Sequence, residues 1–293
     1  MPYPPYSSFD QTTPYTAFSA GSNRQTTPAT TNADGSPHPV ADEQAIADAE
    51  TAVAKLTNPS AYLSQTIYDW VFNESRAGRW ANVFNVVIPR TNSDSALTDL
   101  KGSITPVNNG GTYTNQEGYR LTPTNYIDSG ISLAAVSATG REPKFGIYLE
   151  SFVNGSGVNY ALGVNASDQN SGLCLIAFSE ADNNGVSGYN SFANAQYPNV
   201  SLAELTGTLL SVEADASNVT LRSGNGTDVV ANTAIQPDNP TRTMHINSLN
   251  AGSPSATVGT MSVGFYFAGT AGLDLDGFTT SVNQLMIDLS QTS

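Results

Sequence analysis

Three things are scarce in this sequence of 293 residues: cysteine, basic side chains and long apolar runs. The single cysteine, Cys174, excludes an internal disulfide and any cysteine-rich metal site. It lies in the apolar run 173–178, which favours a buried, unreactive thiol over a nucleophile. Only 11 residues are Lys or Arg, and the net charge is −14. Because phosphate contacts need clustered cations, nucleic acid and anionic membranes are not expected partners.

Targeting and membrane-spanning patterns are missing as well. The opening residues MPYPPYSSFDQTTPY lack the basic and then apolar pattern of a signal peptide. No apolar run approaches the length of a transmembrane helix, so no membrane insertion is predicted. We therefore expect a soluble protein that is made in a cytoplasm.

Common catalytic motifs are also absent. The sequence contains no HExxH, no GxSxG and no P-loop. Its two histidines are His38, in a polar segment, and His245, which alternates with Thr241 and Thr243. That alternation indicates the polar face of a strand and favours a structural histidine. We predict that the protein is not an enzyme and binds no cofactor.

Two acidic patterns leave chemical alternatives open. Glycoside hydrolases need two carboxylates that flank the scissile bond, and Glu150 and Glu180 are the best candidates on different strands. Exposed carboxylates on strand surfaces explain them more simply. Asp274 and Asp276 could ligate calcium together with loop carbonyls. Capping of a helix by Asp276 is the simpler interpretation, so no metal site is predicted.

Residues 1–40 form a segment rich in Pro, Thr, Ser and Gly. Such a segment cannot by itself bury enough apolar surface to offset the entropy of ordering it. We expect an extended arm that docks on a partner protein, with a partly ordered linker as the alternative. The candidate docking residues are the aromatic ones: Tyr3, Tyr6, Phe9, Tyr15 and Phe18.

Two helices follow and are predicted to form a hairpin over residues 41–80. The first, Asp42–Leu56, carries one narrow apolar stripe at helical spacing. The second begins at Pro59, with Asn58 as its predicted cap, and ends at Gly78. We expect this second helix to pack beside the first strand of a large β domain.

From Val83 onward the sequence favours short strands, which are broken by Gly, Asn, Pro and Ser. Apolar alternation or short apolar runs predict strands near 84–88, 145–153, 173–178, 209–212, 219–221, 229–230, 244–246 and 261–267. In the last of these, Met261, Val263, Phe265 and Phe267 are predicted to share one face. A closing helix is predicted after Asp276. Residues 81–293 are therefore expected to form one mainly β domain, an antiparallel sandwich or jelly roll with a C-terminal helix.

Several short motifs occur in an order found in one group of proteins. They are AGRW (77–80), VFNVVIP (83–89), ALTDLKG (96–102), TNQEGYRLTPTNYIDSG (114–130) and VGFYFAGTAGLDLDGFTTSVNQLMIDL (263–289). In this order the chain resembles bacteriophage structural proteins that carry a concanavalin A-like, laminin-G-like jelly roll. The resemblance runs from about Asp42 to the end and has no counterpart for the arm.

The resemblance implies a structural role in a virion that is assembled in the host cytoplasm. The chain would be a capsid decoration or head-fibre component, anchored to a capsid or tail protein through its arm. The alternative is a tail-fibre or receptor-binding, lectin-like protein that recognises host-surface glycans. Association of identical copies into a homo-oligomer is expected of such an appendage.

A possible glycan-binding loop lies at residues 182–197, DNNGVSGYNSFANAQY. Carbohydrate sites stack an aromatic ring on a sugar face and hold hydroxyls with amides and carboxylates. The residues of this loop that suit such a site are Asn183, Asn184, Tyr189, Asn190 and Tyr197. An ordinary polar loop is the alternative interpretation.

Overall fold

A computed structural model describes most of the chain after residue 39. The described residues are 40–132, 135, 144–153, 158–165, 172–179, 184–188, 199–201, 206–214, 218–223, 226–231, 242–250, 254–256 and 259–291. The predicted docking arm, with its five aromatic residues, lies outside them.

Strands dominate the described chain, and helices stand near its two ends. The helices are α1 (Val40–Ala54), α2 (Ala61–Arg76), the 3-10 turn η1 (Trp80–Asn82) and α4 (Leu275–Ser290). The first strands are β1 (Val83–Val87), β2 (Val107–Asn109), β3 (Thr112–Thr114), β4 (Gly118–Leu121), β5 (Tyr126–Ser132), β6 (Lys144–Val153), β7 (Val158–Asn165) and β8 (Gly172–Ser179). The later strands are β9 (Asn184–Gly188), β10 (Asn199–Ser201), β11 (Leu209–Ala214), β12 (Asn218–Ser223), β13 (Gly226–Ala231), β14 (Thr243–Ile246), β15 (Ser248–Asn250), β16 (Pro254–Ala256) and β17 (Thr260–Gly269).

The strands form two sheets. The helix-side sheet runs in the order β13-β12-β11-β6-β17-β4-β3, with β1 also paired to β17. The far sheet runs in the order β10-β9-β8-β7-β14-β5-β2, and β15 and β16 extend it. Apart from β15 with β7, the pairings found in the described chain are antiparallel. The predicted mainly β sandwich with a C-terminal helix is confirmed.

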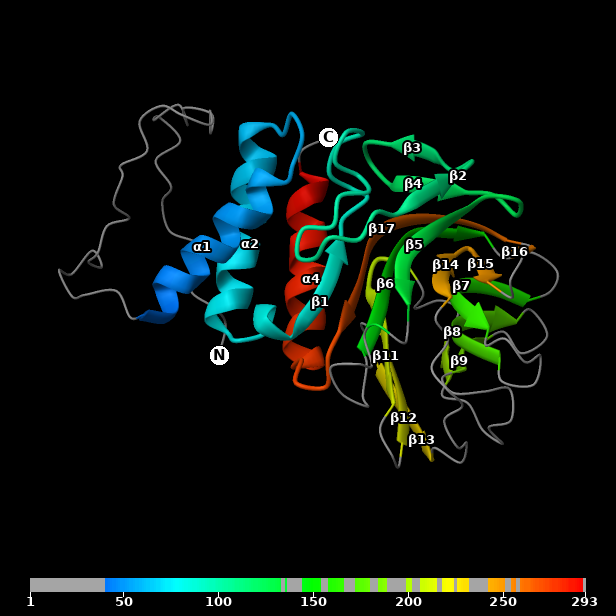
Figure 1. Ribbon diagram of the computed structural model, residues 1–293. Helices are drawn as coiled ribbons and strands as arrows, with labels where there is room; N and C mark the ends of the chain where they lie inside the picture. The colour runs from blue at the N-terminus through cyan, green and yellow to red at the C-terminus, as the bar shows by residue number, and fades with distance from the viewer. Residues whose placement is uncertain are drawn as a thin grey trace.

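Two apolar cores separate three layers. One core lies between the sheets and includes Phe145, Ile147 and Leu149 of β6 with Met244 and Ile246 of β14. The other lies between the helices and the outer surface of the helix-side sheet, where Figure 1 shows α1, α2 and α4 side by side. The layers are therefore helices, helix-side sheet and far sheet, in that order.

The start of α2 differs from the sequence prediction. Ser60, rather than Asn58, caps the helix, because its side chain accepts a hydrogen bond from the Leu63 backbone N–H at 3.1 Å. Asn58 has φ 47° and donates its side-chain amide to Asp94, 3.1 Å away. Asn58 therefore lacks the extended backbone of an N-cap residue, which Ser60 has at φ −66° and ψ 160°. Gly78, with φ 74°, follows the end of α2 as predicted.

The faces of β17 also differ from the prediction. Met261 and Val263 point into the core between the sheets, whereas Phe265 and Phe267 belong to the core under the helices. The register of β17 against β6 shifts between Val263 and Phe265. This bulge reverses the alternation, so the four residues do not share one face.

The helical layer is held by aromatic packing and by one buried ion pair. Phe278 of α4 is fully buried, with its ring centroid 4.7 Å from that of Phe267 and 6.0 Å from that of Trp70. Glu74 of α2 is 0% exposed and accepts two hydrogen bonds of 2.7 Å from the Arg79 guanidinium. Helices from both ends of the chain therefore share one core with the sandwich.

Among the described helices, none combines the length and hydropathy that are needed to cross a bilayer.

Candidate functional site

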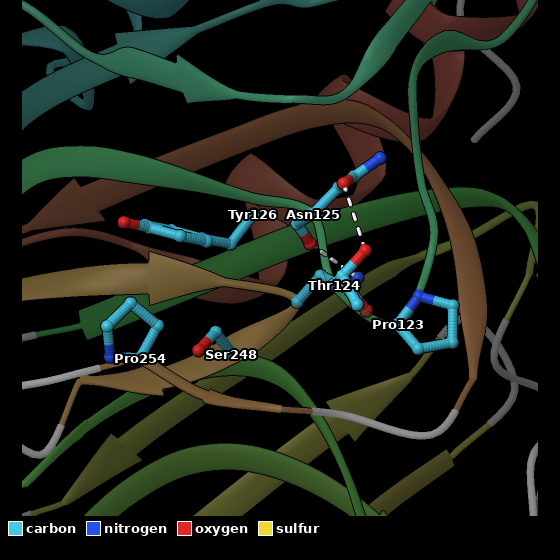
Figure 2. A pocket seen from close by; sticks show the side chains of 7 residues that line it. Pro123, Thr124, Asn125, Tyr126, Ser248 and Pro254 are labelled. Atoms are coloured by element: carbon cyan, nitrogen blue, oxygen red, sulfur yellow. Dashed lines mark hydrogen bonds between the residues drawn. The ribbon is translucent and has the colours of Figure 1, made fainter.

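The far sheet carries a small open pocket at the start of β5. Its volume is about 190 Å³, which is below the range of about 300–1,000 Å³ that is usual for drug-sized ligands. Figure 2 shows the side chains that surround it. The lining residues are Pro123, Thr124, Asn125, Tyr126, Asn247, Ser248 and Pro254. The space is therefore suited to one small ring rather than to an extended ligand.

Asn247 joins the two segments that form most of the pocket wall. It is 1% exposed and has φ 62°, a left-handed conformation that asparagine tolerates, at the corner between β14 and β15. Its side-chain amide donates to the backbone oxygens of Thr122, at 2.8 Å, and Asn125, at 2.9 Å. These two bonds hold the connection between β4 and β5 against that corner.

The aromatic wall of the pocket is supported by a histidine. The rings of Tyr126 and His245 stack with centroids 4.5 Å apart and an interplanar angle of 25°. His245 alternates with Met244 and Ile246, which point into the core, so its own side chain lies on the outer surface of the far sheet. It is only 5% exposed there. His245 lies against the Tyr126 ring, and this position agrees with the structural role that the sequence predicts for it.

Burial sets the charge state of that histidine. Loss of solvent lowers the pKa of His245 below its ordinary value, and nearby Asp128 opposes the shift without reversing it. The imidazole is therefore predominantly neutral at pH 7. A neutral ring can stack on Tyr126 without placing a charge in the pocket wall.

Two buried polar atoms here lack a hydrogen-bond partner among the described residues. They are Oδ1 of Asn247 and Nδ1 of His245. A buried polar atom without a partner costs free energy, so each such atom in a native structure calls for an explanation. Asn247 lines the pocket, and its Oδ1 is a hydrogen-bond acceptor. The pocket lining therefore combines Tyr126 and two prolines with the polar residues Thr124, Asn125 and Ser248, while the Asn247 oxygen is itself buried.

The glycan-binding residues predicted from the loop 182–197 are largely outside the described chain. Asn184 is the first residue of β9, which pairs with β8 and β10 in the far sheet. The other four, Asn183, Tyr189, Asn190 and Tyr197, lie outside the described residues and stay predictions.

Of the two carboxylates that were considered for catalysis, Glu150 lies among the described residues. Glu150 is an ion-pair partner of Arg90, with Nη1 and Oε1 separated by 2.6 Å, and its side chain is 12% exposed. Burial raises the pKa of Glu150, although the Arg90 guanidinium acts in the opposite direction. Glu180 lies outside the described residues. Since Arg90 also donates to the Met286 backbone oxygen at 3.4 Å, this ion pair fastens α4 to the helix-side sheet.

The two acidic residues that were considered for calcium are paired with arginines. Asp274, not Asp276 as predicted, caps α4, and its Oδ1 accepts from the Gly277 backbone N–H at 3.1 Å. Its other oxygen lies 3.6 Å from Arg79, while Asp276 binds Arg222 at 2.7 Å. No group of three or more metal-ligating side chains occurs among the residues that the structure describes.

Sequence reasoning missed the pocket because its walls come from three separate segments. The connection 123–126, the corner 247–248 and Pro254 are brought together only by the pairing of β5, β14, β15 and β16. The local signal was the stretch TPTNY at 122–126, where a turn sequence precedes an aromatic residue.

Comparison with known proteins gives structural likeness without sequence likeness. No protein-family model and no curated protein matches the sequence. A mutant of Trypanosoma rangeli sialidase displaying trans-sialidase activity is 10% identical, with a TM-score of 0.53 over 84% of this chain and 39% of that chain. Botulinum neurotoxin type C, whose cell entry depends on interaction with two ganglioside molecules, is 12% identical, with a TM-score of 0.49 over 73% of this chain and 52% of that chain. The binding domain of botulinum neurotoxin serotype C1 is 10% identical, with a TM-score of 0.48 over 72% of this chain and 53% of that chain.

These comparisons concern the fold alone. The chain spans between 39% and 53% of the length of these three proteins. At 10% identity, what this chain shares with the sialidase mutant is the β-sandwich fold.

Proposed function

We propose that this chain is a structural protein of a bacteriophage particle, a capsid decoration or head-fibre component that displays its sandwich outward. The proposal rests on the motif order from 77–80 to 263–289 and on the mainly β fold that follows it. Residues 1–39 anchor the chain to a capsid or tail protein, and identical copies associate. The location is the virion.

One structural observation supports this proposal: the helices and the pocket lie on opposite sides of the molecule. Residues 1–39 join the described chain at Val40, the first residue of α1 in the helical layer. The pocket lies on the far sheet, across both cores from that layer. A chain that is anchored from the helical side would therefore present the far sheet outward, as a display protein requires.

The proposed role is not catalytic. Glu150 is held by Arg90, and His245 lies under the Tyr126 ring. Neither residue is placed beside a nucleophile in the described chain. The sandwich acts instead as a stable exterior surface, and a net charge of −14 opposes non-specific adhesion to other polyanions.

Removal of residues 1–39 tests the anchoring. Phage particles would be assembled with the full chain, with the chain lacking residues 1–39, and with a full-length variant whose five docking aromatics are replaced by serine. The copies that remain in purified particles would then be counted by quantitative mass spectrometry and located by electron cryomicroscopy. We expect both altered chains to be absent from particles, because the arm binds by burying those rings. Incorporation at the level of the full chain would contradict the proposal.

Recognition of host glycans is the second candidate function, and the pocket on the far sheet favours it. An aromatic residue beside several polar side chains is the combination that carbohydrate sites use. A few copies at the end of a tail appendage would make this recognition the primary role. Many copies over the shell would make decoration the primary role and glycan binding an accessory.

A further inference from the structure

We infer that β13, an edge strand of the helix-side sheet, pairs with the same strand of a second copy of this chain. The inference rests on the association of identical copies in the proposed function, and it deepens that function by naming the surface through which the copies associate. The two β13 strands run antiparallel, so that the helix-side sheets of the two copies join into one.

Among the described strands, β13 is longer than the strands at the other sheet edges. It has six residues, all paired with β12, and no described strand pairs with its other side. The other end strands, β3 of the helix-side sheet and β2 and β10 of the far sheet, have three residues each. Figure 1 shows β13 and β3 at opposite ends of the molecule. Because a short edge limits pairing with another chain, β13 is the edge best suited to an added strand.

The sequence of β13 lacks the features that usually protect an edge strand. GTDVVA contains no Lys and no Pro, and its pairing with β12 shows no bulge. Val229 is 52% exposed, whereas Thr220, which lies opposite to it on β12, is 8% exposed. The strand therefore presents an exposed β-branched side chain, and a cross-strand neighbour from a second copy would cover it.

Charge and face select one register for two antiparallel copies of β13. In this register Val229 lies opposite Val229 of the second copy, and Asp228 lies opposite Val230. A slip by one residue would turn the side chains to the wrong face. A slip by two residues in one direction places the two Asp228 side chains opposite each other, and like charges in that position are destabilising. A slip in the other direction leaves fewer residues paired, so β13 is self-complementary in a single alignment.

The symmetry of this pairing agrees with anchoring from the helical side. Antiparallel strands of two copies in one sheet are related by a two-fold axis perpendicular to that sheet. Such an axis leaves the helical layers of both copies on the same side of the joined sheet. Arg222 of β12 binds Asp276 of α4 and lies opposite Thr227, so Thr227 and Val229 are on that side as well. Residues 1–39 of both copies therefore begin on one side of the dimer.

Sedimentation velocity of the full chain over a wide range of concentrations tests the pairing. We expect a dimer that dissociates on dilution, because the pairing joins one six-residue edge of each copy. Circular dichroism of each variant checks that the fold is retained. Association through residues 1–39 is a different mechanism, and it would not respond to changes at Val229.

Three variants connect the association to β13. Val229→Lys and Val229→Glu each place like charges opposite each other in the inferred register, and each is expected to weaken dimerisation at least about tenfold. An equimolar mixture of these two variants places Lys opposite Glu and is expected to recover the dimer. Val107→Lys makes the same change at a valine of β2 that is also 52% exposed, and it should leave dimerisation unchanged.

Three results would overturn the inference. They are a monomer at every concentration, equal dimerisation by Val229→Lys and the unaltered chain, and a mixture of Val229→Lys with Val229→Glu that stays monomeric. Counting the unaltered chain in purified phage particles separates this inference from the proposed function. A chain that dimerises through Val229 but is absent from particles would contradict the virion role and leave the pairing intact. A chain that is monomeric in solution but enters particles would overturn the pairing and leave the virion role intact.

Discussion

At the scale of single residues, the carboxylate of Glu74 is the most deeply buried charge in the described chain. Its side chain is 0% exposed, and both oxygens accept from Arg79, whose own side chain is 18% exposed. Removal of one partner from a buried ion pair costs more than the pair contributes, because the other charge stays buried without compensation. The turn from α2 into η1 therefore depends on this arginine.

Arg79→Met is expected to lower the free energy of unfolding by about 3–5 kcal/mol, because it strands the Glu74 carboxylate in the core. Urea denaturation followed by circular dichroism measures the change. Arg120→Gln, at an exposed position of β4, is the matched control and should alter stability by no more than about 0.5 kcal/mol. Equal losses of unfolding free energy in the two variants would show that the Glu74–Arg79 pair contributes no more to stability than an exposed residue does.

His245 makes stability depend on pH near neutrality. Burial lowers the pKa of His245 in the folded chain, so the unfolded chain takes up its proton at a higher pH. The stabilisation is therefore fully present above the unfolded pKa of about 6.5 and is lost as the pH falls from there toward the folded pKa. His245→Phe retains a ring to stack on Tyr126 and removes the titration.

Comparison of the unaltered chain with His245→Phe isolates the effect of the histidine on stability. Unfolding free energies would be measured in urea at about pH 7.5 and about pH 5 for the unaltered chain and for His245→Phe. We expect the unaltered chain to lose stability relative to the variant at the lower pH. An unchanged difference between the two chains would mean that the His245 pKa is not lowered on folding.

At the scale of elements, α4 connects the end of the chain to both α2 and the helix-side sheet. Its Phe278 contacts Trp70 of α2 and Phe265 and Phe267 of β17. The reversal of β17 at its bulge is what turns those two phenylalanines toward the helices. The bulge in β17 and the closing helix α4 therefore pack as one structural unit. No local sequence pattern at either element indicates the other.

Phe278→Ala is expected to cost about 3–5 kcal/mol, because it removes a fully buried ring from a packed aromatic cluster. Thr280→Ala, on the exposed surface of the same helix, should change stability by no more than about 0.5 kcal/mol. Both values come from urea denaturation. A loss below about 1 kcal/mol for Phe278→Ala would mean that α4 is not part of the main cooperative core.

At the scale of the whole molecule, the helices and the helix-side sheet share the core that lies between them. Leu209, Tyr148 and Phe265 of the helix-side sheet pack in the same cluster as Ile67 and Trp70 of α2. This arrangement leaves the far sheet as the layer that is separated from the helices by both cores. Both cores include many fully buried side chains of the described residues.

The chain lacking residues 1–39 is therefore expected to unfold in one transition, at a midpoint within about 2 °C of that of the full chain. Differential scanning calorimetry and circular dichroism would be compared, because coincident transitions indicate a single cooperative unit. Two separate transitions, or a midpoint lower by about 10 °C, would show that the arm contributes to the fold itself.

Local patterns in the sequence were sufficient for much of the fold. Alternation at Phe145, Ile147 and Leu149 placed β6, and helical spacing at Leu63, Ile67 and Trp70 placed α2. These signals depend on which face of one element is buried. The spacing of apolar residues along the sequence shows that face directly. The mainly β sandwich and its closing helix were predictable for this reason.

Features that depend on contacts between distant segments were not predictable in the same way. Asn58, the predicted cap of α2, instead donates to Asp94, and Phe265 faces the helices because β17 shifts its register against β6. Each outcome is decided by a partner far away in the sequence, which no local pattern describes.

The sequence by itself determined the helices, the more strongly patterned strands and the scarcity of basic side chains, because composition and periodicity are local properties. Only the tertiary structure decided where the pocket lies. It is formed where the corner at Asn247 meets the connection before Tyr126, with more than a hundred residues between them. The hydrogen bonds from Asn247 to two backbone oxygens hold the two segments together, and their formation depends on partners that are distant in the sequence.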